Sequence, residues 1–264
     1  MSCVSEMPAH SGFVRSIAVH AGERMVMTAG DRTIQVWDLV SLTNIHTFRV
    51  PIDETRALFV DEGRQLLFSG GKGTAKRGGL LVWDLRRDEL LDEREKNADV
   101  FCFAQRELLY FGARDRYVHS LDVARLERGP LLEPPHIDCV TALACAEEAL
   151  VSGSRDRNIR SWDTEELSEK YAPVTPAHAD WVNALATDAE METLYSGSKD
   201  GTVKIWRLDC DEWSNVASLQ GSASGSVNAL CRLDGMFGKA FAAGTGDKHI
   251  RVWRLKDSGP KDSL

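Results

Sequence analysis

One short motif recurs along the whole chain at nearly constant spacing, and it limits what the chain can fold into. The motif is an aromatic or aliphatic anchor followed by a charged residue. The anchors are separated by 46, 38, 41, 44 and 47 residues, and they stand at Trp37, Trp83, Leu121, Trp162, Trp206 and Trp253. A period of this length predicts several copies of one small supersecondary unit, each of which buries its apolar face against its neighbours.

Each copy contains the pattern of β-strands. In the fourth copy, Leu150–Asp156 is followed by Ile159–Trp162, and in the fifth, Leu194–Asp200 is followed by Val203–Trp206. Apolar and polar residues alternate in these segments, which predicts strands with one buried face. The residues between the segments are Gly, Asp, Asn and Ser, which suit tight turns. The sequence therefore predicts an all-β fold.

Four polar or aromatic residues recur with the anchors. A histidine precedes its anchor by 26 to 28 residues at His10, His136 and His178, and an aspartate precedes five of the anchors by six residues. Two copies have the whole set, which is His136, Ser152, Asp156 and Trp162 in one and His178, Ser196, Asp200 and Trp206 in the other. A buried imidazole and a buried indole N–H both need partners, so we expect a closed hydrogen-bond network in each copy.

The other copies depart from this set. In the first copy Thr28 is shifted by one position, the second lacks the histidine and the aspartate, and the third has Phe111 and Leu121 where Ser and Trp would stand. Metal binding or acid–base catalysis is the rival interpretation of the histidines. Their spacing repeats along the chain and does not converge on one site, so we expect no enzyme activity, no metal and no cofactor.

The spacing and the four-residue set resemble the WD-repeat β-propeller family. The resemblance implies a WD40 propeller with six recognisable blades, either closed with six or seven-bladed with one blade missing or degenerate. It also implies one propeller over residues 1–256, followed by a polar tail over 257–264. We expect the segment Ser2–Met7 to supply the fourth strand of the last blade.

A narrower resemblance covers Leu109–Leu208. The segments Glu133–His136 and Ala177–Val182 are similar to the C-terminal WD-repeat domain of the fourth kinesin family. This resemblance implies a domain that binds microtubules, tubulin or cargo. The propellers of that family usually have seven blades, whereas six anchors are present here. The glycine-rich segment Gly70–Gly79 has the wrong order for a nucleotide-binding loop, so we do not expect ATP hydrolysis.

Composition limits the classes of partner and the cellular compartment that we expect. The net charge of −8 argues against nucleic acid, and no apolar run is long enough for a membrane span. The six cysteines form no Cys-x-x-Cys pair, which indicates free thiols in a reducing compartment. We expect a cytoplasmic protein, associated with the cytoskeleton if the kinesin resemblance holds.

The charges of the turns predict where a partner binds. The turns between second and third strands sum to +5, whereas the other two kinds of turn sum to −6 and about −7. One end of the blades is therefore expected to be basic and suited to an acidic peptide such as a tubulin tail. Three residues after each histidine stand Phe13, Cys139 and Trp181, expected at the same end. The candidate partner-binding residues are Phe13, Arg114, Arg116, Arg155, Arg157, Trp181 and Lys199.

Two alternatives remain open. The basic side chains can be solvated or paired locally, and Trp181 can pack under a neighbouring loop. The chain can also be a general WD40 adaptor, either a substrate receptor of a ubiquitin ligase or a signalling scaffold.

Overall fold

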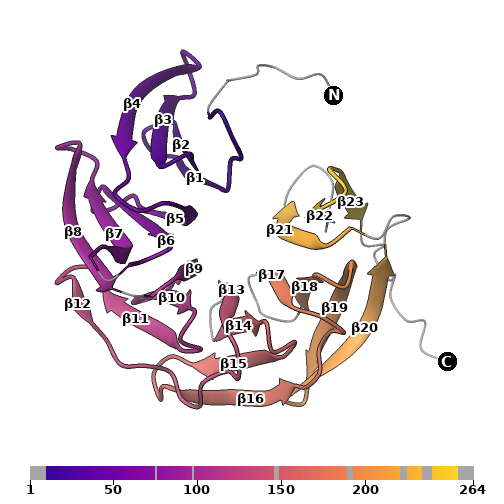
Figure 1. Ribbon diagram of the computed structural model, residues 1–264. Coiled ribbons are helices and arrows are strands. Elements are labelled where there is room, and N and C mark those ends of the chain that lie inside the picture. Colours follow the sequence, from indigo (N-terminus) through magenta and orange to yellow (C-terminus); the bar gives the residue numbers. More distant parts are fainter. Residues whose placement is uncertain are drawn as a thin grey trace. The chain divides into compact units, whose positions relative to one another are not determined.

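The computed structural model describes residues 10–74, 76–96, 98–145, 149–188, 193–220, 225–233 and 240–254. These residues hold 23 strands and no helix. The strands form six sheets, one for each anchor residue (Figure 1), which confirms the predicted all-β, six-bladed β-propeller class. The predicted fourth strand over Ser2–Met7 and the predicted tail over 257–264 lie outside the described residues.

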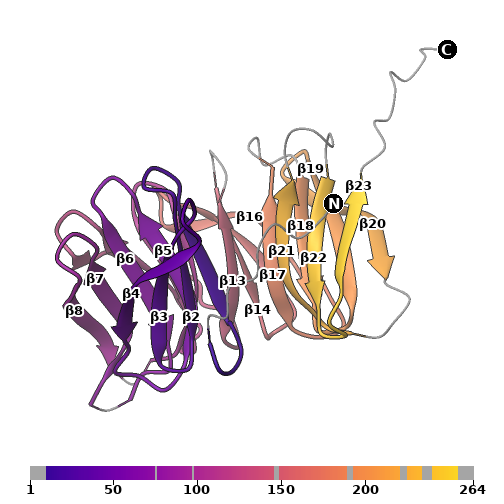
Figure 2. The ribbon, with the colours of Figure 1, turned by 90° about the horizontal axis from the view of Figure 1, so that it is seen from above.

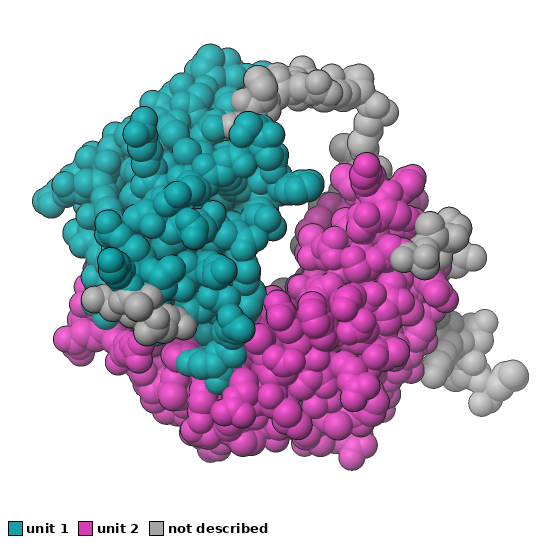
Figure 3. All heavy atoms as spheres, viewed as in Figure 1, with its two compact units in different colours: residues 1–104, 109–115 teal, residues 105–108, 116–264 magenta. Residues whose placement is uncertain are grey.

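The chain divides into two compact units, coloured separately in Figure 3. Unit 1 comprises residues 1–104 and 109–115, and unit 2 comprises residues 105–108 and 116–264. In every sheet the strands pair with their sequence neighbours, as in a meander, and the two views in Figures 1 and 2 show them side by side.

Unit 1 holds the first two sheets. The first sheet has the order β1 (Ser16–His20), β2 (Met25–Gly30), β3 (Thr33–Asp38) and β4 (Thr43–Arg49). The second has the order β5 (Thr55–Asp61), β6 (Leu66–Gly71), β7 (Gly78–Asp84) and β8 (Glu89–Lys96).

The third sheet consists of β9 (Val100–Gln105), β10 (Leu109–Ala113), β11 (Val118–Asp122) and β12 (Glu127–Arg128).

Unit 2 holds the last three sheets. The fourth sheet consists of β13 (Val140–Cys145), β14 (Leu150–Ser154), β15 (Ile159–Asp163) and β16 (Ser168–Val174). The fifth consists of β17 (Val182–Thr187), β18 (Thr193–Ser198), β19 (Thr202–Asp209) and β20 (Glu212–Gln220). The last has three strands among the described residues, which are β21 (Val227–Leu233), β22 (Ala240–Thr245) and β23 (Ile250–Arg254).

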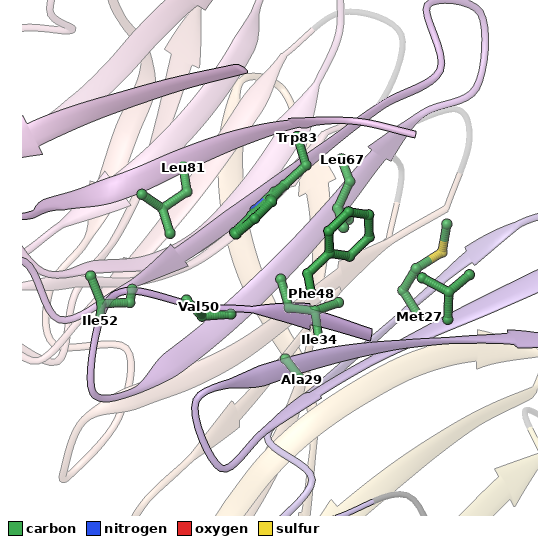
Figure 4. Close-up of a cluster of buried hydrophobic side chains, with 10 residues drawn as sticks. Met27, Ala29, Ile34, Phe48, Val50, Ile52, Leu67, Leu81 and Trp83 are labelled. Carbon is green, nitrogen blue, oxygen red and sulfur yellow. The ribbon is translucent and has the colours of Figure 1, made fainter. Parts of the chain in front are cut away.

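Apolar clusters between neighbouring sheets hold each unit together. In unit 1 the cluster joins the first two sheets and includes Met27, Ile34, Phe48 and Trp83 (Figure 4). In unit 2 a similar cluster joins the fifth and last sheets through Val203, Ile205, Val227 and Phe241. These side chains are the apolar members of the alternating pattern, so burial of one strand face accounts for the periodicity of the sequence.

A valine packed against a glycine recurs at the junctions between sheets. A Cβ atom added at Gly153 in β14 would lie 2.5 Å from Val182 Cγ1 in β17. Gly197 in β18 is in the same position against Val227 in β21. The glycine lets the next strand approach closely, and each such valine is at most 1% exposed. We call this contact the valine–glycine junction.

Candidate functional site

Two hydrogen-bond networks of side chains fix the loops of unit 2. Trp162 Nε1 donates to Ser152 Oγ at 2.8 Å, and Ser152 Oγ lies 2.7 Å from His136 Nε2. His136 Nδ1 lies 2.9 Å from Asp156 Oδ2. The same distances in the next sheet, from Trp206 through Ser196 and His178 to Asp200, are 2.8, 2.7 and 3.1 Å.

The donor and acceptor of each hydrogen bond in these networks follow from the chemistry of the groups. An indole N–H can only donate and a carboxylate can only accept. The serine has one hydrogen, which it donates to His Nε2, so the hydrogen on Nδ1 is donated to the aspartate. This set of directions belongs to the neutral Nδ1–H tautomer of the imidazole ring. Each aspartate also accepts from a backbone N–H of the loop that precedes the sheet, Ile137 N for Asp156 and Ala179 N for Asp200, both at 2.9 Å.

The first copy keeps the network in altered form. Trp37 Nε1 donates to Thr28 Oγ1 at 3.1 Å, and His10 Nε2 lies 3.0 Å from the same oxygen. Thr28 is one position closer to its tryptophan because Asp31 and Arg32 form a two-residue hairpin turn with φ of 47° and 60°. Asp31 accepts from Gly12 N at 2.7 Å.

The second copy keeps part of the network and the last copy replaces it. In the second copy Trp83 Nε1 donates to Ser69 Oγ at 2.9 Å. In the last copy Asp247 Oδ2 accepts from Arg251 Nη2 at 2.5 Å.

The environment of these groups changes their pKa values. Burial lowers the pKa of His178 below 6.5, although the nearby Asp200 acts in the opposite direction. Burial acts to raise the pKa of Asp156, but the hydrogen bonds from His136, Ile137 N and Asn158 N outweigh it and lower the pKa. The pKa of Asp200 is also lowered, because the hydrogen bonds from Thr202 and Ala179 N outweigh its burial.

We expect the stability of unit 2 to fall as the pH is lowered. Because the pKa of His178 is lower in the folded state, the unfolded chain binds more protons below pH 6.5, and stability declines from there downward. A second decline is expected below pH 3.8, where Asp156 and Asp200 are protonated more readily in the unfolded chain. Urea unfolding at about pH 7.5 and about pH 5 measures the first step. His178→Gln should remove the difference that His178 causes, and an unchanged difference would contradict the assignment.

The loops that these networks hold carry a cationic and aromatic cluster in unit 2. Arg155 Cζ lies 4.4 Å from the centroid of the Trp181 ring, and Lys199 Nζ lies 3.9 Å from the same centroid. Trp181 is half-buried, and the Lys199 side chain is 45% exposed. The exposed Arg157 belongs to the same turn as Arg155. We call Arg155, Arg157, Trp181 and Lys199 the Trp181 cluster.

Backbone contacts bring the members of the Trp181 cluster together. Lys199 N donates to Trp181 O at 2.9 Å, and Arg155 N donates to Cys139 O at 3.0 Å, so each turn lies beside the loop that precedes its own sheet. Arg157 has a φ of 72°, in the left-handed region that Gly201 occupies at 83° in the next sheet. Cations held near an indole face are a feature of protein-binding hot spots.

The acidic residues of these loops are turned toward the backbone. Asp138 Oδ1 accepts from Cys139 N at 2.6 Å, and Asp180 Oδ1 accepts from Trp181 N at 2.8 Å. Asp156 and Asp200 are bound by the histidine networks. Lys199 Nζ lies 3.5 Å from Asp180 Oδ2, which is a partly exposed ion pair of small energy.

The other candidate residues lie apart from the Trp181 cluster in the chain. In unit 1, Phe13 is 79% exposed with Arg15 Cζ 5.9 Å from its ring centroid, and Arg114 is exposed with Nη1 3.7 Å from Asp99 Oδ2. Arg116 is exposed in unit 2. Cys139, which stands at the same place in the repeat as Phe13 and Trp181, is buried, and its carbonyl oxygen accepts from Arg155 N.

Sequence reasoning missed a set of polar links between sheets. Thr141 Oγ1 donates to Val182 O, and Asn183 Nδ2 donates to Val227 O at 3.0 Å. Both residues stand five positions after their histidine, so the signal was a polar residue at a fixed place in the repeat. It also missed a hollow of about 350 Å³ in unit 1, lined by Gly12, Phe13, Arg15, Gly30, Asp31, Asp53, Glu54, Thr55 and Lys72.

The described part of the chain has neither a metal-binding cluster nor a membrane-spanning helix. No group of three or more His, Cys, Asp or Glu side chains is placed there to hold a metal ion. No described helix could cross a membrane.

Comparison with curated proteins finds relatives of several kinds. Kinesin-like protein KIF21A of Homo sapiens is 28% identical over 195 residues, which is 69% of this chain and 11% of that protein. Kinesin-like protein KIF21B of Homo sapiens is 26% identical over 95% of this chain and 17% of that protein. Mitochondrial division protein 1 of Aspergillus niger is 26% identical over 99% of this chain and 34% of that protein. The chain thus spans about a third or less of these relatives.

Structure and family comparisons agree on the fold. The structure of U3-55K matches with a TM-score of 0.78 at 20% identity, covering 94% of this chain and 79% of that chain. The family model "WD domain, G-beta repeat" matches residues 1–38, 132–163, 170–207 and 213–254, together more than half of the sequence. The chain therefore belongs to the WD40 repeat family and has its propeller fold.

Proposed function

We propose that this WD40 propeller is a non-catalytic, cytoplasmic protein-binding domain that binds microtubules through the acidic tails of tubulin. WD40 propellers generally serve as protein-interaction scaffolds, and this chain is similar to two proteins named kinesin-like. The observation that carries the proposal is the Trp181 cluster, in which Arg155 and Lys199 lie against one indole ring while the neighbouring aspartates bind backbone N–H groups. Cations at such a surface attract carboxylates and form charge-assisted hydrogen bonds with them.

Co-sedimentation with microtubules at low and moderate salt tests this proposal. The variant Arg157→Glu/Lys199→Glu reverses two exposed charges of the Trp181 cluster, and we expect it to weaken binding by roughly tenfold or more. We also expect binding of the unmodified chain to fall as salt rises, and to be lost on microtubules whose acidic tails have been removed by protease.

A matched control reverses two exposed arginines elsewhere in unit 2. Arg125→Glu/Arg207→Glu makes the same change in net charge in the turn before β12 and in β19. Equal loss of binding in the two variants would contradict a specific role for the Trp181 cluster.

A general adaptor function is the second candidate. It is favoured by the similarity to mitochondrial division protein 1, which extends over 99% of this chain. No co-sedimentation at either salt concentration would reject tubulin as the partner and favour the adaptor.

A further inference from the structure

Ile137 is an exposed apolar residue in a loop of unit 2 that contacts the Trp181 cluster. It is 74% exposed, although its backbone N–H is fixed by a hydrogen bond of 2.9 Å to Asp156 Oδ2. In the next repeat Ala179 stands at this place, and Ala179 N donates to Asp200 Oδ2 at the same distance. Alanine thus fits the loop, so the packing of unit 2 does not account for an isoleucine at this position.

Two cationic turns contact the loop that holds Ile137. His136, the residue before it, donates its backbone N–H to Arg116 O at 3.1 Å, and Arg116 is exposed. Asp156, which accepts from Ile137 N, belongs to the same turn as the exposed Arg157. Ile137 therefore offers an apolar contact that is held rigidly beside arginine side chains, a combination that is common in protein-binding hot spots.

The Trp181 ring holds cations and offers less apolar surface than Ile137. Arg155 Cζ and Lys199 Nζ lie 4.4 and 3.9 Å from its centroid, and Trp181 is half-buried. These cations can meet carboxylates of a partner, but they leave less of the ring for a partner's apolar side chain. An apolar side chain of the partner thus finds its contact at Ile137.

We propose that Ile137 selects an acidic partner segment that also carries a bulky apolar side chain. This selectivity rests on the proposed function, in which carboxylates of the segment bind Arg155, Arg157 and Lys199. The loops of Ile137 and Trp181 precede neighbouring sheets that pack through a shared apolar cluster. Packed sheets lie about 10 Å apart and an extended chain spans about 3.4 Å per residue, so the apolar residue stands about three residues from the carboxylates at the Trp181 cluster.

Fluorescence anisotropy of the full chain with two labelled peptides tests this selectivity. One peptide is a short run of glutamates with a central leucine, and the other has serine in place of the leucine. We expect the leucine peptide to bind roughly tenfold more tightly, because the leucine buries apolar surface on Ile137. Rising salt should weaken the binding of both peptides and leave the ratio of their affinities unchanged.

Ile137→Ala removes the apolar contact and introduces the residue that the next repeat has at this place. We expect this variant to bind the two peptides within about twofold of each other, and to bind the serine peptide as the unmodified chain does. Val216→Ala is the matched control. It shortens another apolar residue of unit 2, in β20, that is 49% exposed, and it should keep the preference for the leucine peptide.

The outcomes distinguish this selectivity from the proposed function. Equal binding of the two peptides by the unmodified chain, or a preference that survives Ile137→Ala, would overturn the role of Ile137 alone, since binding of acidic peptides agrees with the proposed function. Binding of neither peptide would overturn both. Arg157→Glu/Lys199→Glu should weaken the binding of both peptides by the same factor and keep the leucine preference, because it leaves Ile137 unchanged.

Discussion

His178→Ala should lower the free energy of unfolding by roughly 3 kcal/mol. The histidine is 2% exposed, and it links the buried Ser196 to Asp200. Its removal leaves a cavity beside Trp206, takes away the acceptor of the Ser196 hydroxyl and removes the hydrogen bond that Asp200 accepts from the ring. A half-satisfied buried polar network is less stable than either a complete network or an apolar core.

Urea unfolding followed by tryptophan fluorescence measures this effect. His249→Ala is the matched control, because His249 lies in a turn of the last sheet with 69% of its side chain exposed. We expect a change of less than about 0.5 kcal/mol for the control. If His178→Ala cost no more than His249→Ala, the network would be a consequence of folding rather than a source of stability.

The elements of the fold that sequence predicted best are those fixed within one repeat. The distance from Ser152 to Trp162 is set by one hairpin, so the hydrogen bond between them could be expected from spacing. Thr28 shows the limit of an argument from spacing. The hairpin turn of the first copy is shorter by one residue, so the hydroxyl that binds the Trp37 indole stands one position closer to it in the sequence. Turn geometry, and not the count of residues, decides which hydroxyl meets the indole.

The contacts between neighbouring repeats were harder to predict. Arg155 belongs to the fourth sheet and Trp181 precedes the fifth, so their stacking depends on how two sheets pack. Summed charges placed the cations at the turns, but they could not show that Asp138 and Asp180 turn to backbone N–H groups. The direction of a short acidic side chain depends on local hydrogen bonds that composition does not contain.

Trp83→Ala should destabilise unit 1 by roughly 4 kcal/mol, which is the second large effect that we expect. Trp83 is 3% exposed and its ring centroid lies 5.1 Å from that of Phe48, within the cluster drawn in Figure 4. Truncation removes most of this packing and leaves a cavity between the first two sheets, and it also leaves Ser69 without the indole donor.

Trp83→Phe separates packing from hydrogen bonding at this position. Phenylalanine keeps an aromatic ring against Phe48 but loses the N–H that Ser69 accepts, so we expect a loss of about 1–2 kcal/mol. Circular dichroism gives the unfolding free energy of each variant, and hydrogen exchange in β6 and β7 shows whether the loss is local to unit 1. Equal losses in the two variants would mean that the bond to Ser69 contributes more than the packing. The second copy has neither the histidine nor the turn aspartate, but it keeps the pair of Trp83 and Ser69. We therefore expect packing around Trp83 to stabilise this copy in place of the full network.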